Sequence, residues 1–194
     1  MAMSSFGILG VLLVIGVNYG SSYCPSGIYE QGVSAADRST IVNKHNYLRG
    51  LISQGKVAGQ PRATNMKHMQ YSTILEQKAQ EIANSCEFRH VTVTGTPWSW
   101  VGQNLYLHMS TGYGTGANWN EAIQSWFDEH KIYRFGSGFS SGTGHYTQMV
   151  WADTDNVGCG YAYYAKYGGF KYQKLYVCNY GPGGNYVGQN PYRT

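Results

Sequence analysis

Two histidines and one carboxylate are the residues best suited to chemistry in this chain. His145 lies in the string Gly144–Trp151 (GHYTQMVW), and His90 follows the segment Cys86–Arg89. Glu129 falls on a segment with helical spacing, three residues after an apolar position, so its carboxylate should lean toward the core. Imidazoles bind divalent metals, and an imidazole beside a carboxylate can act as a general base. These three groups on separate segments could form one site, although their spacing alone does not bring them together.

The sequence pattern predicts that these groups are positioned by helices in the first part of the chain and by strands later in it. Ser34 to Asp37 resembles a capping box, and apolar residues follow at helical spacing, which predicts a helix that ends in the low fifties. On that helix His45 is interpreted as a core histidine rather than a ligand. Two more helices are predicted over residues 72–86 and 119–130, and Glu129 lies near the end of the second of them.

Strand patterns dominate the last third of the sequence. Alternation and β-branched or aromatic residues predict strands over 146–151, 157–165 and 174–180, with a further short strand at 101–107. Gly168-Gly169 marks a hairpin between two of them. His145 then opens a strand, and alternation leaves some of the tyrosines at 161, 163, 164, 167 and 172 exposed. Helices and an antiparallel sheet together predict an α+β fold.

The first 22 residues are predicted to be a signal peptide. Phe6–Val17 is an apolar run too short to cross a bilayer, and small polar residues up to Ser22 follow it. The alternative is a buried N-terminal strand or helix. Residues 23–194 remain as one domain, which we expect to be secreted, extracellular and not membrane-spanning.

The four cysteines all lie beyond the predicted cleavage site, which suggests two disulfides among three connectivities. Cys159 and Cys178 fall in consecutive strands, so their pairing is the local choice, and Cys24 then pairs with Cys86. No two cysteines have the short spacing of zinc-thiolate sites. The net charge is +4, but only 12% of residues are charged and no basic run exists, so nucleic acid is not expected as a partner.

Three motifs resemble the signatures of the CAP superfamily, the cysteine-rich secretory, antigen-five and pathogenesis-related proteins. They are Gly144–Trp151, Val157–Gly160 and Tyr176–Asn185. The resemblance implies a three-layer α-β-α sandwich with a central antiparallel sheet and a cleft lined by two histidines and two acidic residues. The arthropod antigen-five venom allergens are the most similar group, because Gly-Gln-Asn at 102–104 is common among them.

The resemblance also implies a set of cleft residues. His90, Glu129 and His145 match the family's pattern, whereas Gln103 stands where many members have glutamate. His90 and His145 would be the metal ligands, with zinc bound weakly and lost as the imidazoles protonate below about pH 6.5. No cofactor is required on this reading. The alternative is a hydrogen-bonded polar cluster that only shapes the cleft.

The expected function is non-catalytic binding of a small hydrophobic ligand, such as a lipid, or of an extracellular host protein, with a monomer favoured. The candidate lipid-binding residues are aromatics of the glycine-rich region: Trp98, Trp100, Tyr106, Tyr113 and Trp119. They could instead pack the loop onto the domain. Leu105 interrupts the aromatic spacing of caveolin-like sterol motifs. The enzymatic alternative is a metal-dependent or serine-type extracellular peptidase that uses His145 and Glu129. It is disfavoured because the chain has no HExxH helix and no nucleophile elbow.

Overall fold

The computed structural model describes Cys24 and residues 27–194. The predicted signal peptide, residues 1–22, lies outside them. Helices and strands follow in the order β1 (Ile28–Gln31), α1 (Ala35–Ser53), β2 (Gln70–Tyr71), α2 (Thr73–Ala83), β3 (Gly102–Ser110), α3 (Trp119–Asp128), the 3-10 helix η1 (Glu129–Lys131), α4 (Gly144–Met149), β4 (Asn156–Ala165) and β5 (Tyr172–Gly181). Among these elements, no helix is long and apolar enough to cross a membrane.

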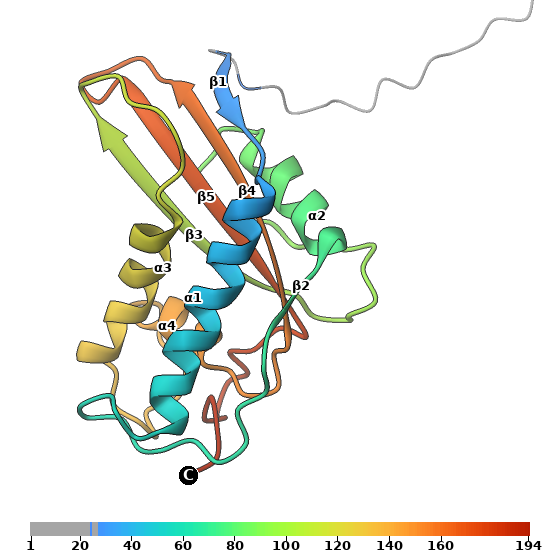
Figure 1. The fold of residues 1–194 in the computed structure, drawn as a ribbon, viewed down its shortest axis with the longest axis vertical. Coiled ribbons are helices and arrows are strands. Elements are labelled where there is room, and N and C mark those ends of the chain that lie inside the picture. Colours follow the sequence, from blue (N-terminus) through green and yellow to red (C-terminus); the bar gives the residue numbers. More distant parts are fainter. Residues whose placement is uncertain (1–23, 25–26) are drawn as a thin grey trace, which may run out of the picture.

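The strands form one sheet in the order β1-β4-β5-β3, in which neighbouring strands are antiparallel, while β2 pairs in parallel with β4. Figure 1 shows α2 on one side of this sheet and α1 on the other, near α3 and α4. The arrangement is a three-layer α-β-α sandwich, so the predicted α+β class and layering are confirmed.

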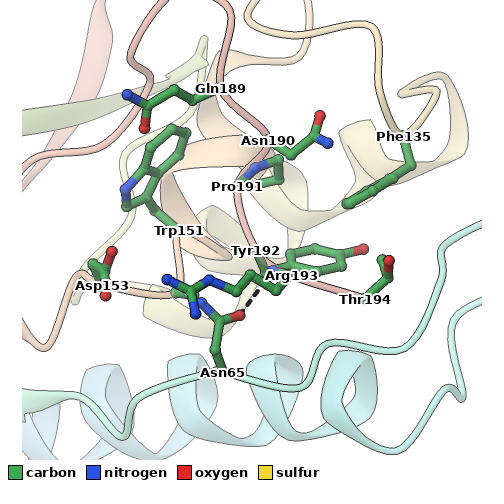
Figure 2. A pocket seen from close by; sticks show the side chains of 11 residues that line it. Asn65, Phe135, Trp151, Asp153, Gln189, Asn190, Pro191, Tyr192, Arg193 and Thr194 are labelled. Carbon is green, nitrogen blue, oxygen red and sulfur yellow. Dashed lines mark hydrogen bonds between the residues drawn. The ribbon is translucent and has the colours of Figure 1, made fainter.

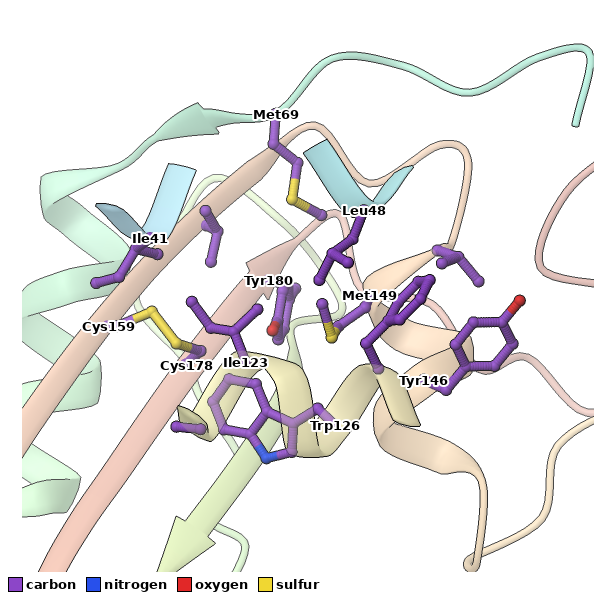
Figure 3. Close-up of a cluster of buried hydrophobic side chains, with 14 of the residues drawn as sticks. Ile41, Leu48, Met69, Ile123, Trp126, Tyr146, Met149, Cys159, Cys178 and Tyr180 are labelled. Carbon is purple, nitrogen blue, oxygen red and sulfur yellow. A yellow bond between two sulfur atoms is a disulfide. The ribbon is translucent and has the colours of Figure 1, made fainter. Parts of the chain in front are cut away.

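Two hydrophobic clusters fill the spaces between the layers. Residues of one strand alternate between them: Tyr161 and Tyr163 lie in the cluster beneath α1 and α3, whereas Ala162 and Tyr164 lie in the cluster beneath α2. Figure 3 shows the first cluster, where the disulfide between Cys159 and Cys178 lies among the side chains of α1 and α3. Because helices cover both faces of the sheet, alternation here does not separate buried from exposed residues.

Some of the hairpin tyrosines were predicted to be exposed, which is true of Tyr167, but the alternation along the strand on which the prediction was based is wrong. Tyr161, Tyr163 and Tyr164 are buried on opposite faces of the sheet, Tyr172 is half-buried, and Tyr167 at the hairpin turn is exposed. The extended run of buried residues in β4 is the pattern of a strand covered on both sides.

The first helix begins as its sequence predicts. The Ser34 hydroxyl accepts the Asp37 N–H at 3.1 Å, and the Asp37 carboxylate accepts the Ser34 N–H at 3.1 Å, which completes a capping box. His45 is fully buried, so the interpretation as a core histidine is confirmed. The second disulfide joins Cys24 to Cys86, and all four cysteines are paired as expected.

The predicted strand over residues 146–151 is wrong, because this segment forms the short helix α4 and the turn after it. Tyr146, Thr147, Gln148 and Met149 are all buried. A fully buried segment shows neither helical nor strand periodicity, so its apolar content was misread as alternation. His145 thus lies in the first turn of a helix rather than at the start of a strand.

Candidate ligand cleft

Glu129 fixes the position of His145. The carboxylate follows α3 directly, and its Oε1 lies 2.6 Å from Nδ1 of His145, while its Oε2 accepts the backbone N–H of Tyr146 at 3.0 Å. Trp126, one turn earlier, stacks on the imidazole with ring centroids 6.3 Å apart. An ionised carboxylate accepts hydrogen bonds only, so Nδ1 of His145 carries the proton and Nε2 has the free lone pair.

His90 is oriented by Gln103 in a similar way. Oε1 of Gln103 accepts the Val91 N–H at 3.1 Å and lies 3.1 Å from Nδ1 of His90. The Gln103 amide nitrogen donates to the Val91 carbonyl at 3.4 Å and to Oδ1 of Asn179 at 3.0 Å. The backbone partners fix which end of the amide is oxygen, so Nδ1 of His90 must donate to it. The lone pair of His90 is therefore also on Nε2.

Both histidines line one cleft of about 520 Å³. Gln103 lines it as well, but Glu129 does not and lies behind His145. The apolar part of the lining comes from Val91, Trp100, Val101, Phe139 and Val187. The structure thus brings His90, Gln103 and His145 together at one surface, with Glu129 as a supporting group.

The donor set of the cleft is limited to two imidazoles. Within the described residues no group of three or more His, Cys, Asp or Glu side chains could hold a metal ion. Two neutral imidazoles with protonated Nδ1 atoms suit zinc or copper, but a structural zinc site normally has four protein ligands. The residues present therefore fit an open, weak site in which other ligands complete the coordination.

A chain of buried hydrogen bonds joins α4 to α1, and sequence reasoning missed it. The Asn104 amide donates to the His145 carbonyl at 3.1 Å and to the Tyr180 hydroxyl at 3.3 Å. That hydroxyl lies 2.9 Å from Nε2 of His45, whose Nδ1 lies 2.8 Å from the Ile41 carbonyl. The carbonyl can only accept, so Nδ1 of His45 donates and the Tyr180 hydroxyl donates to Nε2. Burial lowers the pKa of His45 to about 4, which keeps the ring neutral.

Arg49 is a second residue that the sequence did not single out. Its buried guanidinium donates to five backbone carbonyls, those of Lys67, Met149, Trp151, Ala152 and Thr154. Four of these carbonyls belong to the end of α4 and the turn that leads to β4. Desolvation lowers the pKa of Arg49 to about 10, but the group remains charged at neutral pH. An arginine in the apolar stripe of the predicted helix was the only signal for this role.

The five aromatic residues considered for lipid binding do not lie in one place. Trp100 lines the cleft and donates its indole N–H to the Gly184 carbonyl at 2.9 Å. Trp119 is buried in the core, where its ring meets Tyr176 edge-on at 5.1 Å. Tyr106 packs against Tyr176 from β3, and Tyr113 and Trp98 lie in separate loops. Only Trp100 among them borders the histidine cleft.

A second hollow of about 540 Å³ lies between the C-terminal segment and the turn after α4. Figure 2 shows Trp151 and Asn65 around it, with Arg193, whose backbone N–H donates to Oδ1 of Asn65 at 2.8 Å. Neither histidine borders this hollow. We therefore take the smaller, histidine-lined cleft as the candidate site.

The fold and the cleft define a class, the α-β-α sandwiches with paired histidines in a central cleft. The model of the Cysteine-rich secretory protein family, CAP, matches residues 42–180, and the chain belongs to this family. Among curated relatives, Salivary antigen-5 of Dipetalogaster maximus is 39% identical and covers 96% of this chain and 79% of its own length. Venom allergen 5 of Vespula maculifrons is 37% identical over 86% of this chain and 85% of its own.

Solved structures give the same picture. BmVAL-1 superimposes with a TM-score of 0.71 at 29% identity, covering 88% of this chain and 86% of its own. NaASP2 in a crystal structure with Zn²⁺ has a TM-score of 0.69 at 28% identity, covering 87% of this chain and 90% of its own. The salivary and venom relatives confirm the expected similarity to arthropod antigen-five proteins.

Proposed function

We propose that this protein is secreted and non-catalytic, and that its cleft binds a small hydrophobic ligand and, weakly, a divalent metal ion. The observation that carries the proposal is the state of the two imidazoles. In each ring Nδ1 is engaged by a side chain that holds the proton there, which leaves Nε2 as the free ligand atom at a common cleft.

The Glu129 carboxylate and the Gln103 amide orient the two imidazoles as outer-shell groups orient metal-binding histidines in other proteins. A carboxylate or amide oxygen on the second ring nitrogen fixes the tautomer and raises the basicity of the ligand atom. The similar protein NaASP2 has been crystallised with Zn²⁺. Gln103 contributes no negative charge, which favours weak binding over a permanent structural zinc.

The apolar lining supports a hydrophobic ligand in the same cleft. Phe139 and Trp100 are about half exposed, and Val187 is largely exposed, so the cleft presents apolar side chains to solvent. A volume of about 520 Å³ is within the range of small-molecule sites, which are commonly apolar with a few placed polar groups. His90 and His145 would then face the polar end of the ligand, directly or through the metal ion.

A catalytic role has less support. All four cysteines are in disulfides, so none is a free nucleophile. Within the described chain no hydroxyl donates to Nε2 of His145, although Ser141 borders the cleft. The secreted state rests on the predicted signal peptide, the two disulfides, and the salivary and venom relatives.

The test is zinc titration by calorimetry together with native mass spectrometry of the protein secreted from eukaryotic cells. His90→Ala with His145→Ala should abolish zinc binding and leave the thermal unfolding transition in place. The matched control, His68→Ala with His108→Ala, removes two accessible histidines outside the cleft and should leave zinc affinity unchanged. Equal zinc affinity in both double variants would exclude this cleft.

The hydrophobic ligand is tested separately in the same spectra. A co-purified lipid mass that is lost in Trp100→Ala with Phe139→Ala would support the cleft as its site. A lipid retained by that variant would place it elsewhere. Peptide hydrolysis that disappears in His145→Ala and Glu129→Gln would replace the non-catalytic proposal with the peptidase alternative.

A further inference from the structure

The turn between β4 and β5 carries an unusual pair of exposed aromatic side chains. Tyr167 is 97% exposed and Phe170 is 55% exposed, although neither contributes to the cleft or to the core. The Lys166 N–H donates to the Lys171 carbonyl at 2.8 Å and closes the loop below them. Figure 1 shows this hairpin turn at the end of the sheet opposite the C-terminal end of α1.

Two lysines flank these aromatic residues. Lys166 and Lys171, with Tyr167, line a hollow of about 460 Å³ at the turn. The segment 165–172 contains no acidic residue. On the neighbouring strand β1, Glu30 pairs with Tyr163, back from the turn, and its carboxylate accepts the Gly116 N–H at 2.8 Å. The turn is therefore a small positively charged surface with apolar rings at its tip.

A packed aromatic base supports the turn. The rings of Tyr29, Tyr113 and Tyr172 contact one another with centroids 5.5–6.2 Å apart. Lys174 donates to the carbonyls of Thr115 and Gly116 and so holds the adjoining loop against the hairpin. Tyr29 and Tyr113 are themselves about half exposed. The same end of the sheet thus presents further apolar surface around the turn.

We propose that this turn docks on the surface of an anionic lipid bilayer. Tyrosine and phenylalanine side chains partition into the interfacial region of a bilayer, and each lysine near an anionic surface adds about 1 kcal/mol of attraction. The lysine-lined hollow would take a lipid phosphate, while Tyr167 and Phe170 enter between headgroups. A sulfated polysaccharide would also attract the lysines, but it offers nothing to the two exposed aromatic tips.

Such binding is weak and reversible, since two lysines and two aromatic residues make only a small anchor. This role is independent of the cleft, because none of the residues that line the hollow at the turn borders the cleft. The docked protein would have its sheet end on the bilayer and its α1 C-terminal end away from it (Figure 1).

The experiment is co-sedimentation of the secreted protein with vesicles of phosphatidylcholine containing about a third phosphatidylserine, and with pure phosphatidylcholine, at low salt. Lys166→Ala with Lys171→Ala should weaken binding to the anionic vesicles about 30-fold, from two contributions of about 1 kcal/mol each. Tyr167→Ser with Phe170→Ser should weaken it by on the order of tenfold. All four side chains are at an exposed turn, so the variants should fold normally.

The matched control variants lose the same two positive charges, or a comparable pair of apolar side chains, as the variants at the turn. Lys56→Ala with Lys131→Ala and Tyr47→Ser with Ile132→Ser change exposed residues on or just after α1 and η1, and should bind like the unaltered protein. No binding of the unaltered protein to anionic vesicles would overturn the proposal. So would equal effects of the turn and control variants, or capture by heparin with no vesicle binding.

Discussion

The carboxylate of Glu129 serves two neighbours at once, with Oε1 2.6 Å from Nδ1 of His145 and Oε2 3.0 Å from the N–H of Tyr146. One side chain at the end of α3 thereby holds both the imidazole and the first turn of α4. The proposed metal ligand and the local fold around it depend on the same group.

Glu129→Gln should weaken both zinc binding by His145 and the stability of the fold around α4. An amide can accept from only one of the two donors, and its NH₂ group would face the other. We expect zinc affinity to fall by about 10–100-fold and the free energy of unfolding to fall by about 1–3 kcal/mol. Calorimetry and urea unfolding measure the two effects. Glu81→Gln, on the exposed face of α2, is the control, and a Glu129 variant that behaves like it would contradict the role described above.

The neutral, buried His45 should make stability depend on pH. Its pKa is about 4 in the folded protein against about 6.5 when unfolded, so the unfolded state binds the extra proton first as pH falls. Stability is therefore complete above about pH 6.5 and is lost between there and pH 4, by about 3 kcal/mol. Urea unfolding at pH 7, 5.5 and 4 tests this. In His45→Gln the fall over that range should be smaller by about that amount, and an unchanged slope would exclude His45 as its source.

Arg49→Met should be among the most destabilising single changes. It removes the guanidinium donor from five backbone carbonyls, of which those of Trp151 and Ala152 keep a backbone N–H, and each buried polar group left unpaired costs about 1–3 kcal/mol before relaxation. We expect a loss of at least about 3 kcal/mol, which Arg49→Lys should restore only in part, because an ammonium group cannot reach all the acceptors. Arg62→Met, at an exposed position, is the control. Chemical denaturation that showed a loss below about 1 kcal/mol would contradict the assignment.

Gly160 lets α2 approach the sheet closely. A Cβ at this position would overlap the backbone of α2 at Ala79 and Gln80, and backbone atoms cannot move aside locally. Gly160→Ala should cost about 1–3 kcal/mol or more through overpacking. Gly50→Ala in α1 is the contrast, since its Cβ would meet only ordinary contacts, and it should stabilise by about 0.5–1 kcal/mol. Thermal unfolding of both variants tests whether the first lowers the midpoint temperature and the second raises it.

Much of the fold could be predicted from local chemistry. The capping box at Ser34, the spacing of Ile41 to Ile52 and the long β4 and β5 strands depend on neighbouring residues, and the structure confirms each of them. The meeting of His90, Gln103, Glu129 and His145 around one cleft was expected only from family resemblance, and the hydrogen bonds that pair them were not predicted. Residues on different elements have no local signal of their contact, so periodicity could not have supplied it.

The failures have a physical cause as well. The α4 segment is enclosed on all sides and is held by Glu129 at its start and by Arg49 after its end, so its own residues did not indicate a helix. The tyrosines of β4 were expected to alternate in exposure, but α2 covers the second face of the sheet. In both cases tertiary contacts bury residues on every side, so the local pattern of apolar residues does not report the structure.

The two histidines of the cleft sit on walls of different rigidity. His145 belongs to a segment whose carbonyls are bound by Arg49 and Asn104. The hydrogen-bonded amides that follow it, at Tyr146 and Thr147, should therefore exchange with solvent deuterium only when the whole domain opens. His90 is exposed and is held only through the side chain of Gln103. The backbone N–H groups around His90 should therefore exchange through small local openings. Ligands of different width would then be accommodated by movement of the segment that carries His90, while α4 and His145 stay in place.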